Sequence, residues 1–468
     1  MALREEQLED IQWALDSLLP LQSGYSRARR YYQGTHQRMI DNERLKNIFG
    51  RLFRDFRLNL CKPVVDSLVD RLQVSGFSSG DTEEQNAADV WKRNHMARRA
   101  GQVHLEAITA GDAYVLVWPD ETNRPTIYPH KAHEVAVDYS ASEPGLITRA
   151  AKLWRPDEDT VRLTVYRAER VERYVARRLI SGGLPATQPV DPYYQGSELL
   201  ATTERDLYDD GGQFFPTGEA TEGAAGVDKA QSFTEYRDDG PAVIPNPFGV
   251  VPVFHFANNS DLGERGISEL WDAMPVQDML NYLAFQILVN AEYQGHRQRW
   301  ATGVEIRTDP LTGEPINPFR AGPERVWVAG NTDEAGAKFG EFAPGDLSQL
   351  DSVKKAAALD MAQVSQTPPH YFFVASNLVS GESQKTAEQK LDAKVSDRQI
   401  AFGDTWAQVV SLAVRMERGL SQDGLELDTN WKDTKPRNEL ESWQVAQMKS
   451  ELGVSKEQIL REMGYTDE

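Results

Sequence analysis

The chain has 468 residues, of which 40% are hydrophobic, and carries a formal net charge of −20. This length supports about two to four domains with a sizeable core. The acidic balance argues against a protein that reads DNA sequence through a basic face. It is compatible with a conduit through which DNA slides without tight phosphate contacts, or with a charge that serves solubility alone.

Membrane insertion and disulfide chemistry are not indicated. No apolar stretch approaches the roughly 20 residues that span a bilayer, and the first ten residues, MALREEQLED, lack the apolar core of a signal peptide. Cys61 is the single cysteine, so no disulfide can form within one chain and no CxxC motif exists. The expectation is a cytoplasmic protein without a membrane partner, metal or cofactor.

Residues 1–110 are predicted to be mostly helical. Two sets of apolar residues keep a helical spacing, one near the N-terminus and one after Pro63: Leu8, Ile11, Leu15, Leu18 and Leu19, then Val64, Val65, Leu68 and Leu72.

From residue 111 to 180 the periodicity changes. The runs AYVLVW, TIYPHKAHEVAVDY, LITRAAKLW and TVRLTVYRAERVERYV are rich in β-branched and aromatic residues and predict a meander of antiparallel strands. Residues 181–240 are rich in Gly, Asp, Glu, Ser and Thr without periodicity, which predicts an exposed acidic loop or insertion.

The helical signal returns at residues 266–297, where one apolar stripe runs from Ile267 to Leu288 with a possible kink at Pro275. Residues 298–346 then predict a small α/β module whose DPLTGEP stretch forms a hairpin tip. Another helix is predicted over residues 347–367, ending at Pro368 and Pro369.

The segment TPPHYFFVASNLVSGES, residues 367–383, predicts a loop between two helices. Its aromatic residues Tyr371, Phe372 and Phe373 are expected to pack at the base of the loop. The following helix is predicted over residues 384–416, starting at Ser383 or at Thr386.

Three basic residues recur on this helix at i, i+4 and i+8: Lys390, Lys394 and Arg398. Like charges at this spacing destabilise an isolated helix by a few tenths of a kcal/mol per pair, so we expect something outside the helix to offset them. Two readings stay open. The face is solvated, with Glu388, Asp392 and Asp397 nearby, or it meets a polyanion or the carboxylates of a neighbouring subunit.

The chain resembles the portal proteins of tailed double-stranded DNA bacteriophages, of the type found in siphoviruses of actinobacterial hosts. The resemblance covers nearly the whole chain and rests on stretches that occur in order: RRYYQGTH, RLNLCKPVVDSLVDRLQVSGF, GDAYVLVWPD, FGVVPVFHFANN, GISELWDAMPVQDMLN, LVNAEYQGHRQRWATG and TPPHYFFVASNLVSGES.

The resemblance implies an α+β portal fold and a closed ring of about twelve subunits. It divides the chain into a mixed α/β wing, a two-helix stem, a small α/β clip, a channel-lining loop and long helix, and a helical crown. The corresponding segments are wing 1–265, first stem helix 266–297, clip 298–346, second stem helix 347–367, tunnel loop 368–383, channel helix 384–416 and crown 417–468.

The resemblance also implies residue roles. The tunnel loop would present Val374, Ala375, Ser376, Asn377, Leu378, Val379 and Ser380. The channel helix would face DNA or a neighbouring subunit through Lys385, Lys390, Lys394 and Arg398. The clip would dock partner proteins through Asp309, Pro310, Thr312 and Glu314.

The implied function is a ring at one capsid vertex of the virion that packages, retains and ejects DNA. The implied partners are double-stranded DNA, bound without sequence specificity, the terminase large subunit, a head-tail adaptor, scaffold protein and the major capsid protein. The alternative is another oligomeric head-to-tail connector or minor capsid protein without a DNA-gating loop.

Enzymatic readings have weaker support. The chain has no GxxxxGK[ST], GxSxG or HExxH motif. His130 and His133 are predicted to lie on one strand, where side chains three residues apart point to opposite faces, which disfavours a shared metal. Acidic pairs such as Asp238 and Asp239 fall in the polar insertion, where nothing fixes a nuclease metal. No catalytic residue is therefore predicted.

Overall fold

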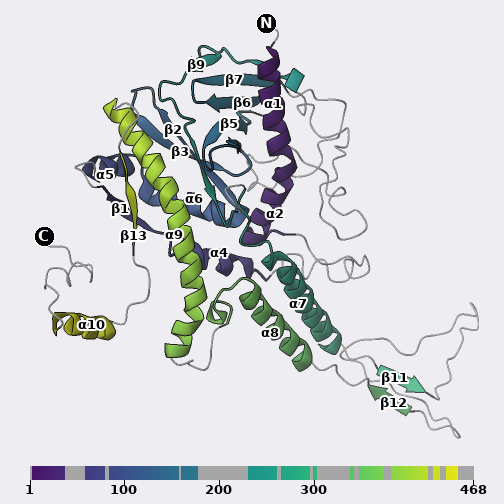
Figure 1. Cartoon of the computed structure of the whole chain (residues 1–468). Helices are drawn as coiled ribbons and strands as arrows, with labels where there is room; N and C mark the ends of the chain where they lie inside the picture. Colours follow the sequence, from purple (N-terminus) through teal and green to yellow (C-terminus); the bar gives the residue numbers. More distant parts are fainter. Residues whose placement is uncertain are drawn as a thin grey trace, which may run out of the picture.

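The computed structural model describes residues 3–36, 58–79, 84–157, 160–177, 230–260, 265–295, 299–302, 338–341, 347–373, 381–419, 425–432 and 439–451. A body of helices and two larger sheets carries a projecting helix pair, α7 (Ala273–Gly295) and α8 (Leu347–Val364), as Figure 1 shows. The long helix α9 (Gly381–Arg418) runs along the body and extends beyond it. This mixed helix and sheet content agrees with the predicted α+β class.

The predicted N-terminal helices are present, with one strand among them. They are α1 (Glu5–Leu18), the 3-10 helix η1 (Leu19–Leu21), α2 (Gln22–Gln33), α4 (Cys61–Val69), α5 (Glu84–Arg93) and α6 (Met96–Ala110). The prediction of a mostly helical segment agrees with these elements, but the sequence did not predict β1 (Val74–Ser78), which pairs with β13 (Asp428–Trp431). The partner of β1 is about 350 residues away in the chain, so local periodicity could not reveal this pair.

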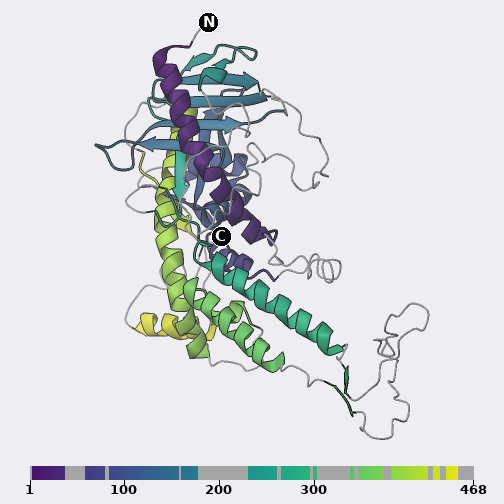
Figure 2. The same ribbon diagram turned by 90° about the vertical axis from the view of Figure 1, so that its right-hand side faces the viewer.

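The predicted antiparallel strands are present, but they divide between two sheets instead of forming one meander. Strands β4 (Val135–Tyr139), β5 (Ile147–Trp154), β6 (Thr160–Arg167), β7 (Arg170–Arg177) and β8 (Thr234–Glu235) form one antiparallel sheet in chain order, and β9 (Val243–Pro245) also pairs with β7. Helix α1 covers one face of this sheet (Figure 2) and buries Ile11, Leu15 and Leu18 against it. The helical spacing of those leucines therefore marks a core-facing side, as expected.

A second sheet has the order β10-β2-β3 and lies deeper in the body. Its strands are β2 (Asp112–Pro119), β3 (Pro125–Lys131) and β10 (Val253–Ala257). Strand β2 is buried on both faces: Val115 belongs to the main core with α6 and α9, while Leu116 packs towards the meander. Trp406 of α9 is fully buried in that main core, so α9 is an integral part of the fold.

The last part of the predicted acidic insertion is ordered, which corrects the expected boundary. Residues 230–240 contain η3 (Ala230–Ser232) and β8. Phe233 and Tyr236 are buried, and the Tyr236 hydroxyl donates a hydrogen bond to Asp239. Phe233 joins the core under the sheet, whereas the Tyr236 ring packs against Arg162 and Arg173. Residues 181–229 lie outside the described part of the chain.

The two helices predicted over residues 266–297 and 347–367 are present as a projecting antiparallel pair, most clearly seen in Figure 2 and called the stem below. At their far end β11 (Arg299–Thr302) pairs with β12 (Lys338–Glu341). The first helix begins at Ala273 instead of residue 266. The amide of Ile267 donates to the Asn258 carbonyl at 2.7 Å and the amide of Glu269 to the Ile108 carbonyl at 3.0 Å, so the body holds this segment in a non-helical path.

Proline positions fit these boundaries. Pro275 lies in the first turn of α7, where a missing N–H removes no helical hydrogen bond, so the expected kink is not required. Helix α8 ends at Val364, before the double proline. Gln366 adopts a left-handed φ of 50°, and the Thr367 amide closes the turn on the Ala362 carbonyl at 3.0 Å.

Helix α9 has 38 residues, which corresponds to about 57 Å. It begins at Gly381, so the expected starts at Ser383 and Thr386 are corrected. The predicted helical crown contains helix α10 (Glu439–Glu451), but it also contains β13. The Thr429 hydroxyl of β13 donates to the Gly403 carbonyl at 2.7 Å, which holds this strand against the middle of α9.

Candidate functional site: the channel helix and the stem

The residues predicted for the clip and the tunnel loop lie outside the described part of the chain. This applies to Asp309, Pro310, Thr312 and Glu314, and to Val374, Ala375, Ser376, Asn377, Leu378, Val379 and Ser380. The residues at the base of the predicted tunnel loop lie within the described part of the chain. Tyr371, Phe372 and Phe373 pack, partly buried, against the main core, which confirms their expected place.

The four basic residues predicted for the channel helix all lie on α9, in different settings. Lys390 is exposed, and the side chain of Lys385 is not among those that the structure describes. Lys394 is half-buried and Arg398 is only 5% exposed. That Lys385 and Lys390 face DNA or a neighbouring subunit therefore stays a prediction. For Lys394 and Arg398 the prediction is corrected, because their side chains turn towards the interior of the chain.

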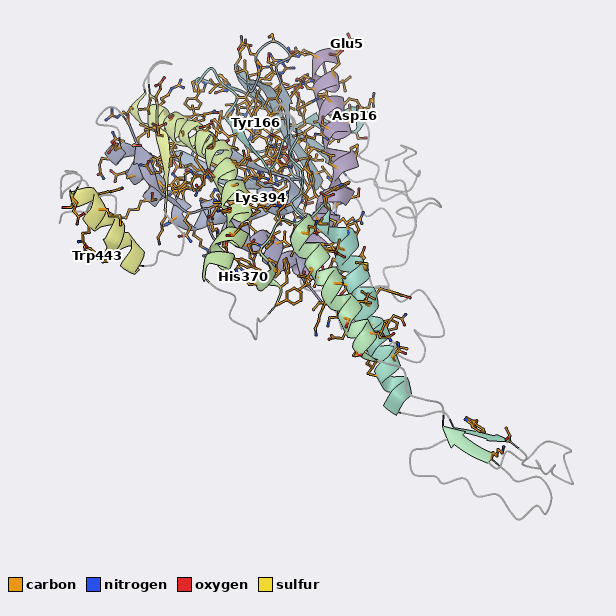
Figure 3. The ribbon with its side chains drawn as sticks, turned by 60° about the horizontal axis from the view of Figure 1, so that its bottom comes forward. Glu5, Asp16, Tyr166, His370, Lys394 and Trp443 are labelled. Carbon is orange, nitrogen blue, oxygen red and sulfur yellow. The ribbon has the colours of Figure 1, made fainter. Side chains whose placement is uncertain are left out.

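Glu269, just before α7, accounts for the inward orientation of Lys394 and Arg398 (Lys394 is labelled in Figure 3). The Lys394 ammonium pairs with one carboxylate oxygen of Glu269, and Arg398 Nη2 lies 3.4 Å from the other. Lys394 also donates to the Ser365 carbonyl at 2.8 Å, and Arg398 Nε donates to Asn258 Oδ1 at 2.8 Å. An anion from outside the helix thus offsets the like charges, as expected, and it comes from the same chain.

Arg71, which follows α4, ties the N-terminal half of α9 to η4 (Pro369–Tyr371), the segment before the predicted tunnel loop. Its guanidinium donates to Asp392 at 2.6 Å, Glu388 at 2.5 Å and the Tyr371 hydroxyl at 3.1 Å. Sequence reasoning placed these two carboxylates beside the α9 cations and missed Arg71. No local pattern reveals an ion pair between residues more than 300 positions apart.

The body meets the stem at a tight crossing of two backbones. A Cβ on Gly266 would lie 1.9 Å from the Gly111 carbonyl oxygen, so only glycine fits there. The Asn258 amide donates to the Gly111 carbonyl at 2.7 Å, and the Gly266 amide donates to Asp112 Oδ1 at 2.7 Å. Asp112 also accepts from the Tyr25 hydroxyl at 2.6 Å. This junction fixes the start of the stem relative to the body.

The outer sides of the stem expose large apolar side chains. Met279 and Tyr282 are 40% and 47% exposed on α7, and Val353, Leu359 and Val364 are 44–52% exposed on α8. Only a narrow side of α8 is buried, through small residues and one methionine: Ala357, Ala358, Met361 and Ala362. The chain alone therefore leaves much of the apolar surface of its stem uncovered.

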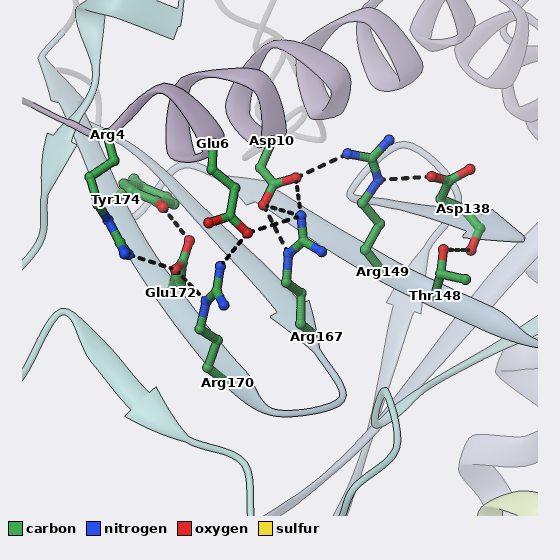
Figure 4. A network of polar contacts seen from close by, with 10 residues as sticks. All are labelled: Arg4, Glu6, Asp10, Asp138, Thr148, Arg149, Arg167, Arg170, Glu172 and Tyr174. Carbon is green, nitrogen blue, oxygen red and sulfur yellow. Dashed lines mark hydrogen bonds and ion pairs between the residues drawn. The ribbon is translucent and has the colours of Figure 1, made fainter. Parts of the chain in front are cut away.

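A network of ion pairs fastens α1 to the meander and is shown in Figure 4. Asp10 is 1% exposed and accepts from Arg167 at 2.6 Å and from Arg149 at 2.9 Å. Glu172, also 1% exposed, accepts from Arg170 Nε at 2.7 Å. Because both carboxylates are covered and paired, this network serves the fold and offers no ligand site.

The histidine pair does not form a metal site. His130 lies next to the last residue of β3, but His133 lies in the turn after the strand, which corrects the expected strand position. His130 Nδ1 lies 3.3 Å from Glu134, and burial lowers the pKa of His133 to about 4. Within the described ranges, no group of three or more His, Cys, Asp or Glu residues is placed to hold a metal ion.

One buried relay has the form of a catalytic triad. The Tyr139 hydroxyl lies 2.6 Å from His255 Nδ1, and His255 Nε2 lies 2.7 Å from Asp112 Oδ1. Burial raises the pKa of Tyr139 above its usual value. The hydroxyl is therefore a poorer nucleophile than a free tyrosine, and the relay is explained by its support of the stem junction.

A family comparison identifies the chain. The family described as "Phage portal protein, SPP1 Gp6-like" matches residues 23–468. The chain belongs to the phage portal protein family. A portal protein of Mycobacterium phage D29 is 25% identical over 380 residues, covering 79% of this chain and 67% of that one. A portal protein of Mycobacterium phage L5 is 28% identical over 198 residues, covering 41% of this chain and 40% of that one.

The solved structures to which the chain is similar come from gene transfer agent (GTA) particles. The neck of an empty GTA particle, computed with C6 symmetry, has a TM-score of 0.48 and 12% identity, with 92% of this chain and 96% of that chain covered. The neck of a native GTA particle, computed with C12 symmetry, has a TM-score of 0.47 and 12% identity, with 92% and 95% covered.

This phage portal protein is thus a structural component of the virion rather than a member of an enzyme family. Among its described helices, none has the length and apolarity needed to cross a membrane.

Proposed function

We propose that this portal protein forms a closed ring of about twelve copies around a channel for double-stranded DNA. The supporting observation is the stem, whose exposed apolar side chains one chain cannot cover by itself. A ring gives each stem two neighbours and would remove those side chains from water.

The exposed side chains lie on more than one side of the stem. Val353 and Val364 are eleven residues apart, about three helical turns, so they lie along one line on α8. Leu359 lies on another side, since six residues from Val353 correspond to a rotation of about 240° from it. A two-fold dimer needs one self-complementary patch, whereas a head-to-tail ring needs two different surfaces. The stem therefore favours the ring.

Helix α9 is proposed to line the channel, with Lys385 and Lys390 as the remaining candidates to face DNA or a neighbouring subunit. The net charge of −20 suits passage of DNA, because it limits tight phosphate contacts. The ring would package, retain and eject DNA without reading its sequence. The terminase and the head-tail adaptor would dock on the clip at residues 298–346, and scaffold and major capsid protein on the wing and crown.

The alternative is a head-to-tail connector or minor capsid protein that lacks a DNA-gating loop. Native mass, measured by light scattering with electron microscopy of the same sample, separates the readings. A ring of twelve has a mass of about 630 kDa, twelve times the 52.6 kDa of one chain. A small dimer without a central hole would contradict the proposal.

The contribution of the stem is tested with Val353→Glu/Val364→Glu, which places two charges on one outer line of α8. The substituted positions are exposed in the single chain, so the fold should survive while the ring gives way to monomers. Leu146→Glu is the matched control, because Leu146 is 48% exposed in the turn between β4 and β5, away from the stem. Rings of normal mass in the double variant would show that this line does not join subunits.

A further inference from the structure

Basic residues gather where α5 turns into α6, in a chain with a net charge of −20. Lys92 and Arg93 end α5, and Arg98 and Arg99 follow in the first turns of α6. The connection is tight: the His95 amide donates to the Lys92 carbonyl at 3.0 Å, and the Arg98 and Arg99 amides both donate to the His95 carbonyl at 3.3 Å. All four cations therefore lie within one short turn of chain.

The C-terminal end of α9 adds to this cluster. Arg93 forms a bidentate ion pair with Glu417, with distances of 2.9 and 3.0 Å. Figure 1 shows α5 beside this end of α9. Arg415 and Arg418 lie in the same last turn of α9 as Glu417. We call Lys92, Arg93, Arg98, Arg99, Arg415 and Arg418 together the α5–α6 basic surface.

Intramolecular pairing does not account for two of these cations, Lys92 and Arg98. Lys92 and Arg98 are exposed, and neither forms an ion pair with any residue in the described ranges. Arg93 is different, because Glu417 pairs with it and Asp120 and Asp89 also act on it. Arg98 and Arg99 also stand where the helix dipole disfavours cations. The fold itself gains little from the charges of Lys92 and Arg98, which points to an external anion.

The chemistry of the surface favours phosphate over an acidic protein. Large apolar side chains are exposed at several places on the chain, but none of them belongs to α5, α6 or the last two turns of α9. Trp91 and Met96 point into the core instead. Protein interfaces depend on buried aromatic and apolar anchors, whereas contacts to a nucleic-acid backbone are made largely by Lys and Arg.

We propose that the α5–α6 basic surface binds the phosphate backbone of double-stranded DNA without reading its sequence. The inference rests on the proposed function, in that DNA is the polyanion this ring encounters. It adds a contact distinct from the predicted channel residues, because Glu417 lies about 40 Å along α9 from Lys390. The surface would hold DNA at the body end of the subunit.

The test compares the full-length protein with Lys92→Glu/Arg98→Glu, using anisotropy of a short fluorescent duplex across a salt series. Lys62→Glu/Lys432→Glu is the matched control, because both lysines are exposed and the change in net charge is the same. The expected result is a loss of about tenfold or more in affinity at low salt, with a salt slope reduced by about two, for the first variant alone.

Equal losses in both double variants would overturn the inference, since net charge alone would then account for DNA binding. Loss of binding to polyglutamate, with DNA binding unchanged, would also overturn it and assign the surface to an acidic protein. Native mass is measured on the same samples. A normal ring whose DNA affinity is insensitive to Lys92 and Arg98 refutes this inference and leaves the ring standing, whereas absence of a ring in the wild type refutes the proposed function.

Discussion

Removal of the Glu269 carboxylate should destabilise the fold strongly, because two buried cations depend on it. The side chains of Glu269, Lys394 and Arg398 are 8%, 16% and 6% exposed. Loss of one partner from a buried ion pair costs about 3–5 kcal/mol. Lys394 would keep the Ser365 carbonyl, and Arg398 would keep Asn258 and the exposed carboxylate of Asp397. We therefore expect Glu269→Ala to lower the free energy of unfolding by about 3 kcal/mol, the low end of that range.

The measurement is urea denaturation followed by tryptophan fluorescence, on protein kept monomeric by Val353→Glu/Val364→Glu if the wild type forms rings. Glu417→Ala is the control, because its pair with Arg93 is 33–40% exposed and should contribute about 0.2–1 kcal/mol. If Glu269→Ala lowers the free energy of unfolding no more than Glu417→Ala does, the ion pairs of Glu269 with Lys394 and Arg398 do not stabilise the fold as argued. Those two residues would then return as candidates to face DNA or a neighbouring subunit.

Two further predictions concern the core and the stem junction. His104 is fully buried between the Leu72 carbonyl and Trp406 Nε1, and burial lowers its pKa to about 4. The unfolded chain takes up a proton on this histidine near pH 6.5, whereas the native state does so only near pH 4. The free energy of unfolding should therefore fall by about 3 kcal/mol as the pH drops from 6.5 to 4. His104→Gln should reduce this dependence of the unfolding free energy on pH, measured by denaturation at a series of pH values. Gly266→Ala should prevent soluble folding, as judged by circular dichroism, because its Cβ would meet the Gly111 carbonyl at 1.9 Å. Gly24→Ala in α2, with open space around its Cβ, should leave stability unchanged or raise it by up to about 1 kcal/mol.

Local chemistry determined the elements and the family. The leucines of α1 are spaced to form one buried side of a helix. The β-branched runs from residue 111 onwards favour strands, and they form the antiparallel sheets. The double proline after α8 could not continue a helix. The quoted stretches also suffice to recognise a portal protein, because family resemblance depends on residue order rather than on three-dimensional contacts.

Tertiary contacts decided where these elements stop and what their polar residues do. Ile267 keeps the helical spacing of α7, yet its amide is bonded to Asn258, so the helix begins later. Arg398 has the spacing of a surface row, yet Glu269 and Asn258 hold it in the interior. Strand β1 has no local partner and pairs with β13 near the other end of the chain. Periodicity reports only which residues share a side of an element. The partner of that side comes from a distant part of the chain, and only the folded structure brings the two together.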